Sequence, residues 1–165
     1  PAYWLFLAGL VLGTFVDFEH FIIPDSVTIG GMAAGPALSA LVPLMHGRET
    51  WWQGLLSSCL GLAVGFGSLY AVAWIGSKIF KKEAMGFGDV KLMGAIGAFL
   101  GWQSVLFTIF ASSLLGSVCG LAMIALGQAK LQSRIPFGPY ISLAAAIWLF
   151  WGHSILSLYL GLMSR

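Results

Sequence analysis

Long apolar runs that contain no charged residue are the feature that most constrains the fold of this chain. Residues 53–77 and 104–127 form two such runs. Each is longer than the roughly 20 residues that an α-helix needs to cross the hydrocarbon core of a bilayer. Only 8% of the residues are charged, whereas a soluble domain usually carries about 25%. We therefore predict an all-α, polytopic integral membrane protein.

The polar breaks between the apolar runs predict about six transmembrane or partly spanning helices. The fourth run is a short or tilted crossing, because its eleven residues extend only about 16 Å as a helix. The last run contains Gly152 and His153 near its middle, where we expect a bend or a split. The expected helices cover residues 3–16, 25–45, 53–77, 90–100, 104–127 and 140–163.

The basic residues are distributed unevenly between alternate loops. If the first run reaches the cytoplasm at Asp17, then Asp25 and Asp89 lie at the same membrane face. Cytoplasmic loops are enriched in Lys and Arg, and this orientation places six of the eight there: Lys78, Lys81, Lys82, Lys91, Lys130 and Arg134. The net charge of +2 does not indicate a nucleic-acid partner.

Two of these acids suit peptide hydrolysis. Asp89 follows Gly86 and Gly88 in the segment EAMGFGDVKLMGAIG, residues 83–97. An ionised carboxylate can activate water while a protonated one donates to the carbonyl oxygen, and neighbouring carboxylates share a proton because both do not ionise easily. The glycines permit a positive φ and leave room for an extended substrate. We therefore expect Asp17 and Asp89 to lie close together.

Each acid also has a simpler interpretation. An acid at the end of a membrane helix is usually a solvated interface residue. Asp25 lies in a first helical turn, where capping or an interaction with the helix dipole is expected. Glu19 and His20 are expected to be solvated loop residues.

Three segments follow one another along the chain: DFEHFIIPD (17–25), GFGDVKLMGAIGAFLGW (86–102) and IPFGPY (135–140). In this order they resemble the three motifs of the bacterial type IV prepilin peptidases, which belong to the G-x-G-D group of membrane aspartic proteases. The resemblance covers essentially all 165 residues. It implies an aspartic endopeptidase that removes the basic leader of type IV prepilins or pseudopilins. The implied place is the cytoplasmic face of the bacterial inner membrane, in pilus biogenesis or type II secretion.

The resemblance also implies roles for individual residues. Asp17 and Asp89 correspond to the catalytic pair. The residues expected to support them are Gly86, Gly88, Asp25 and Lys91. The candidates for a substrate loop are Glu19, Pro136, Phe137, Gly138 and Pro139.

We expect residues 1–165 to form a single membrane-embedded peptidase core. Bifunctional members of that family add an N-terminal helix and a cytoplasmic segment with paired C-x-x-C zinc motifs, neither of which occurs in this sequence. We therefore expect no metal, and S-adenosylmethionine only if a full-length enzyme also methylates. Two other classes stay open: a non-catalytic membrane scaffold, and an ion-coupled transporter that uses the interfacial carboxylates.

The substrate is expected to be a single-span protein that is extended at the scissile bond. A glycine before the cut would favour this conformation, because glycine is a poor helix former. The apolar helix after the cut is expected to pack against a small-residue stripe formed by Gly61, Gly65 and Ser68.

Overall fold

The computed structural model describes residues 2–81, 85–127 and 136–163, and within these ranges the chain is helical without a strand. The all-α prediction is therefore confirmed. The elements are α1 (Ala2–His20), α2 (Asp25–Leu41), the 3₁₀-helix η1 (Pro43–His46), α3 (Trp51–Phe80), α4 (Phe87–Leu100), α5 (Trp102–Ala125) and α6 (Gly138–Met163).

Four of the helices, α1, α3, α5 and α6, are long and apolar enough to cross a membrane. The chain is therefore a multi-pass membrane protein. The expected helix 25–45 ends early, at Leu41, and η1 follows it. The cause is Pro43, which disfavours a helical conformation at the preceding Val42, where φ is −131°.

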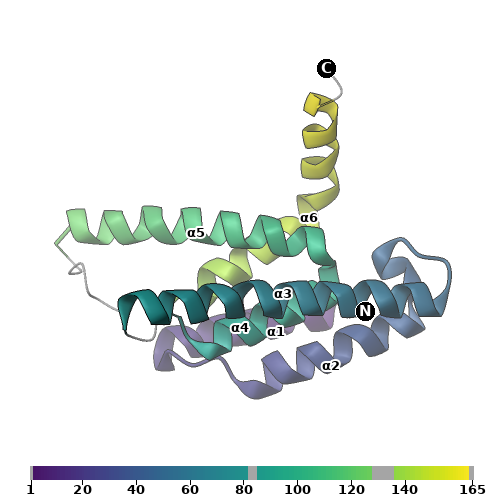
Figure 1. The fold of residues 1–165 in the computed structure, drawn as a ribbon, viewed down its shortest axis with the longest axis horizontal. Helices are drawn as coiled ribbons and strands as arrows, with labels where there is room; N and C mark the ends of the chain where they lie inside the picture. The colour runs from purple at the N-terminus through teal and green to yellow at the C-terminus, as the bar shows by residue number, and fades with distance from the viewer. Residues whose placement is uncertain (1, 82–84, 128–135, 164–165) are drawn as a thin grey trace.

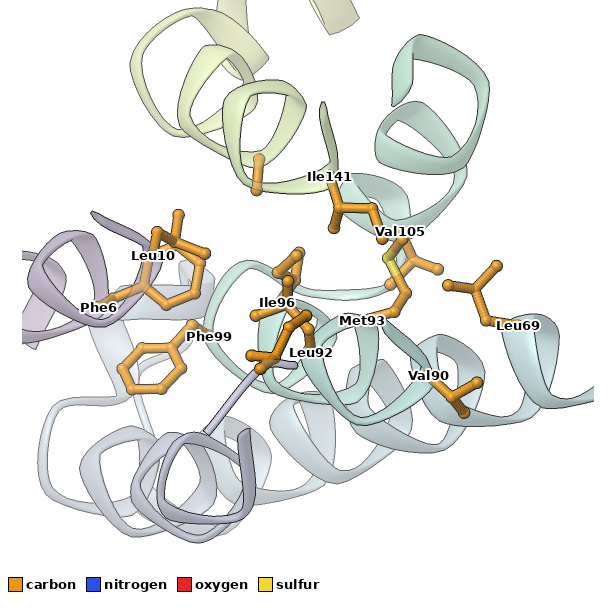
Figure 2. Close-up of a cluster of buried hydrophobic side chains, with 12 residues drawn as sticks. Phe6, Leu10, Leu69, Val90, Leu92, Met93, Ile96, Phe99, Val105 and Ile141 are labelled. Atoms are coloured by element: carbon orange, nitrogen blue, oxygen red, sulfur yellow. The ribbon is translucent and has the colours of Figure 1, made fainter. Parts of the chain in front are cut away.

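The short helix α4 forms the centre of the bundle. Every residue from Leu92 to Phe99 is buried, and the helix contacts α2, α3, α5 and α6. Figure 2 shows its side chains pointing in several directions toward the surrounding helices, and the Phe99 ring stacks on Phe6 of α1 with 4.9 Å between ring centroids. A helix that is apolar on all sides is expected inside a large core, so α4 holds the bundle together.

Helices α3 and α4 approach so closely that their backbones are in contact. A Cβ atom on Gly61 would overlap the Gly97 carbonyl, and one on Gly65 would overlap the Met93 carbonyl. Small residues allow such approach between membrane helices. The prediction that Gly61 and Gly65 receive a substrate helix is therefore wrong, because α4 already occupies that face.

Helix α6 is continuous from Gly138 to Met163, so the expected split does not occur. Figure 1 shows the helix changing direction partway along its length, so that its C-terminal part turns away from the bundle. The Trp148 ring lies against Gly152, where a Cβ atom would come within 2.9 Å of the ring. Glycine at this position leaves room for the indole.

The connections of the bundle alternate between its two ends (Figure 1). The C-terminal ends of α1, α3 and α5 and the N-terminal ends of α2, α4 and α6 lie at one end. At the other end η1 approaches the α4–α5 junction, where a Cβ on Gly101 would lie 3.7 Å from the His46 ring. The three motifs therefore gather at a single end of the molecule.

Candidate active site

Asp17 and Asp89 line one cavity at the motif end of the bundle. Asp17 lies in the last turn of α1 and Asp89 in the first turn of α4. Both are buried, with exposed fractions of 5% and 8%. The cavity has a volume of about 270 Å³, and its lining residues are Asp17, Phe21, Ile22, Ile23, Asp25, Gly86, Phe87, Gly88, Asp89 and Lys91.

The segment before Asp89 is shaped by close packing and not by an unusual backbone. Gly86 has a φ of −65°, and Gly88 is not among the residues with positive φ, so the expected use of a positive φ is wrong. Instead, a Cβ on Gly88 would lie 3.3 Å from Cβ of Ile23, and one on Gly86 would lie 3.4 Å from Oδ2 of Asp89. Gly88 thus lets the start of α4 approach the α1–α2 connection.

Asp89 has an unusual protonation behaviour. Burial is the larger cause and the charge of Asp17 the smaller one, and together they raise the pKa of the Asp89 carboxyl from 3.8 to about 7. Asp89 belongs to none of the four helices that can span a membrane. A carboxyl of this kind is protonated at mildly acidic pH, where an ordinary aspartate is ionised. The site can therefore hold a protonated carboxyl next to a second one.

Asp17 is held by the third motif. The backbone N–H of Gly138 donates to Oδ2 of Asp17 at 3.1 Å, although the two residues are far apart in the sequence. A Cβ atom on Gly138 would lie 2.6 Å from that oxygen. The contact therefore depends on glycine at the start of α6.

The other substrate-loop candidates lie away from this cavity. Phe137 lines a separate cavity with Tyr140 and residues of α5, and Pro139 lines an apolar cavity between α1 and α6. Pro136 is half-buried. Glu19 is exposed and lies 3.9 Å from His20, so it does not contribute to the cavity lining.

Asp25 is engaged in an ion pair. Nζ of Lys91 donates to Oδ1 of Asp25 at 2.6 Å, and this pair joins the first turn of α2 to α4. The side chain of Asp25 makes no capping hydrogen bond, and Pro24 is the N-cap residue, so the capping prediction is wrong. Because the Asp25 side chain is 64% exposed, we expect the pair to contribute at most about 1 kcal/mol.

Ile23 is a site residue that the sequence did not indicate. It is buried, and it packs where Gly13 of α1, Gly88 of α4 and Gly138 of α6 come together. Its neighbour Phe21 has a φ of 54°, which is uncommon for a residue other than glycine. The only signal in the sequence was that apolar residues interrupt the polar break between α1 and α2.

The site offers no obvious metal ligand set. Across the part of the chain that the structure describes, no group of three or more His, Cys, Asp or Glu side chains could hold a metal ion. The chemistry available to the cavity is that of two carboxylates, one exposed ion pair and a backbone N–H.

Comparison with known proteins identifies relatives of the whole bundle. Residues 4–121 match the type IV leader peptidase family. A protein of Stutzerimonas stutzeri named "Prepilin leader peptidase/N-methyltransferase" is 33% identical over 152 residues, which cover 92% of this chain and 50% of the relative. Proteins of the same name are 35% identical in Aeromonas salmonicida, over 95% of this chain and 53% of the relative, and 34% identical in Pseudomonas aeruginosa, over 92% and 50%. The chain spans about half the length of these curated relatives. No solved structure gives a significant match.

Proposed function

Because this chain belongs to the type IV leader peptidase family, we propose that it is a membrane aspartic endopeptidase. Its substrates are type IV prepilins or pseudopilins, from which it removes the basic leader. The observation that carries this proposal is that Asp17 and Asp89 are both buried and line one cavity. The named relatives support the substrate class.

The carboxylate pair can supply both proton transfers of peptide hydrolysis. An ionised carboxylate removes a proton from water while a protonated one donates to the carbonyl oxygen. The raised pKa of Asp89, about 7, supports this division at the pH of the cytoplasm. We propose no cofactor for proteolysis.

The name of the relatives also includes N-methyltransferase, and S-adenosylmethionine would be the methyl donor of a full-length enzyme that also methylates. The catalytic cavity, at about 270 Å³, is smaller than the roughly 300–1,000 Å³ of typical small-molecule sites. This cavity therefore does not fit such a donor beside a peptide, and we assign no methyl transfer to its residues.

We place the cavity at the cytoplasmic face of the bacterial inner membrane. Lys78, Lys81 and Lys91 lie at or near this end of the bundle, and cytoplasmic loops are enriched in basic residues. A cut at this face would separate a basic leader, which stays in the cytoplasm, from an apolar helix in the bilayer.

For the apolar helix of the substrate we propose a groove between α1 and α2. This cavity of about 450 Å³ is lined by apolar and small residues, including Leu12, Val27, Gly30 and Ala34, and by Phe99 of α4. It begins directly after Asp25, so a helix in it would continue from the catalytic cavity into the membrane. Both its chemistry and its position fit the residues that follow the cut.

The substitution Gly30→Leu tests the groove. A Cβ atom on Gly30 would meet no atom within 4 Å, and Gly30 lines the groove, so we expect the variant to fold and to raise the KM for a full-length prepilin by filling the groove. Gly67→Leu on α3, where an added Cβ atom also meets no atom within 4 Å, is the matched control and should leave KM unchanged. Equal KM values for the two variants would contradict the groove assignment.

The proposed function itself is tested by incubating the purified protein with a prepilin in detergent. Mass spectrometry should show a single cut between the basic leader and the apolar helix. A protein that leaves prepilins intact but moves protons across vesicle membranes would instead be an ion-coupled transporter. A protein that does neither, yet is required for pilus assembly, would be a scaffold.

A further inference from the structure

The two buried carboxylates have different partners. Oδ2 of Asp17 accepts a hydrogen bond from the backbone N–H of Gly138 at 3.1 Å. Within residues 2–81, 85–127 and 136–163, the Asp89 side chain makes no hydrogen bond, whereas Asp17 accepts that of Gly138. A backbone N–H favours the ionised form of the carboxylate that accepts it. The site is therefore asymmetric before any substrate binds.

The Gly138 N–H is available because of its position at the start of a helix. The first N–H groups of an α-helix have no partner within the helix. In this turn Pro139 has no N–H, and the Tyr140 N–H already donates to the Phe137 carbonyl at 3.1 Å. Gly138 is thus the free donor of the first turn, and the helix terminus adds a partial positive charge.

The contact leaves no space for a side chain on Gly138. A Cβ atom there would lie 2.6 Å from Oδ2 of Asp17 and 3.1 Å from Cδ1 of Ile23. The Ile23 methyl can rotate aside, but the carboxylate can move only by giving up the hydrogen bond. Any larger residue would therefore displace Asp17.

We propose that Gly138 is a positioning residue whose N–H orients Asp17 and favours its ionised form, so that Asp17 is the general base and Asp89 the general acid. This inference rests on the proposed peptidase function and assigns the two roles within it. Asp17 is buried as well, so the Gly138 N–H acts against the cost of burying its charge. Asp89 accepts no such hydrogen bond from the described residues, and burial with the charge of Asp17 raises its pKa to about 7, which supports the same assignment.

The proposed steps balance in atoms and protons. Asp17 takes a proton from water as the water oxygen bonds to the scissile carbonyl carbon, and Asp89 gives its proton to the carbonyl oxygen. The resulting gem-diol then returns a proton to Asp89, while Asp17 protonates the amide nitrogen as the C–N bond breaks. The products are a carboxylic acid and an amine, and both aspartates regain their starting states.

The test is the pH profile of kcat for Gly138→Ala, measured with a prepilin in detergent. We expect kcat at neutral pH to fall about 10- to 100-fold, the usual effect of losing a hydrogen bond to a charged group. The acidic limb of the profile should move to higher pH, because the base loses its donor. KM should stay within about twofold of the wild-type value.

Gly116→Ala is the matched control. Its new methyl would press on the Phe137 ring at 3.3 Å without touching Asp17, so the pH profile should be that of the wild type. If Gly138→Ala does not fold, Ile23→Val/Gly138→Ala removes the Cδ1 methyl that opposes the new side chain, with Ile23→Val as its reference.

Three outcomes distinguish the proposals. A lower kcat with an unmoved acidic limb would overturn the role of Gly138 in favouring the ionised form of Asp17, and so would a profile equal to that of Gly116→Ala. If the wild-type protein cleaves no prepilin, the proposed function itself fails. Active wild-type protein with a shifted limb in Gly138→Ala supports both.

Discussion

Replacing Asp89 by Asn should stabilise the fold, and the stabilisation should grow with pH. The pKa of Asp89 is raised from 3.8 to about 7 in the folded protein. Between these two pH values the carboxyl is ionised in the unfolded chain but protonated in the folded protein. Stability is therefore lost as pH rises from about 4 to about 7. At pH 8 the full shift applies, and at 1.36 kcal/mol per unit it costs about 4 kcal/mol.

The same relation gives the difference in stabilisation by Asp89→Asn between pH 5 and pH 8. At pH 5 the folded carboxyl is still protonated, and the cost is about 2 kcal/mol. The cost thus grows over about two further pH units at 1.36 kcal/mol each, so Asn, which carries no charge, should stabilise the protein by about 2.7 kcal/mol more at pH 8 than at pH 5. For a chain of this size such a difference corresponds to roughly 5–11 °C in Tm.

The assay is thermal unfolding in detergent at pH 5 and pH 8, with Asp25→Asn as the matched control. Asp25 is exposed and paired with Lys91, so its replacement should change stability by less than about 1 kcal/mol. The same gain in Tm at both pH values would show that folding does not raise the pKa of the Asp89 carboxyl.

Three further predictions concern the surroundings of the pair. Cleavage should decline as pH rises above about 7, because Asp89 loses the proton that it must donate; full activity at pH 9 would refute this. Gly88→Ala should reduce kcat more than Gly86→Ala. The new methyl of Gly88→Ala would lie 3.3 Å from Ile23, whereas that of Gly86→Ala would lie 3.4 Å from the Asp89 oxygen at an exposed position. Equal rates would show that the approach of α4 to Ile23 is unimportant. Asp25→Lys should reduce activity by severing the ion pair between α2 and α4, and Asp25→Lys/Lys91→Asp should recover most of it; a double variant no better than the single one would argue against a pairing role.

The sequence predicted the helices well because hydropathy alone determines them. Uncharged runs of more than 20 residues became α3 and α5, and the short run after Asp89 became α4. The early end of α2 could have been predicted from Pro43, whose effect on the preceding residue is local.

Contacts between helices were not predictable in the same way. The small residues Gly61 and Gly65 indicate that something packs closely against α3, but their spacing does not say whether the partner is α4 or a substrate. Asp25 likewise suits a helix start in any sequence, and only the placement of Lys91 shows that it forms an ion pair.

The candidate site was predicted in part. The motifs indicated Asp17 and Asp89, and the charge distribution placed them at one face. Gly138 was predicted only as a substrate-loop residue, and its contact with Asp17 was not. That contact and the place of Ile23 depend on how α6 and the α1–α2 connection meet in three dimensions, which the spacing of residues along the chain does not show.

The most direct test of the central claim is the rate of prepilin cleavage by Asp17→Asn and Asp89→Asn, measured by mass spectrometry beside Asp25→Asn. If the two buried aspartates share the proton transfers, each of the first two variants should lose at least about 10³-fold in kcat while remaining folded, and Asp25→Asn should keep measurable activity. Near-wild-type cleavage by either Asp17→Asn or Asp89→Asn would contradict the claim that these two carboxylates form the catalytic pair.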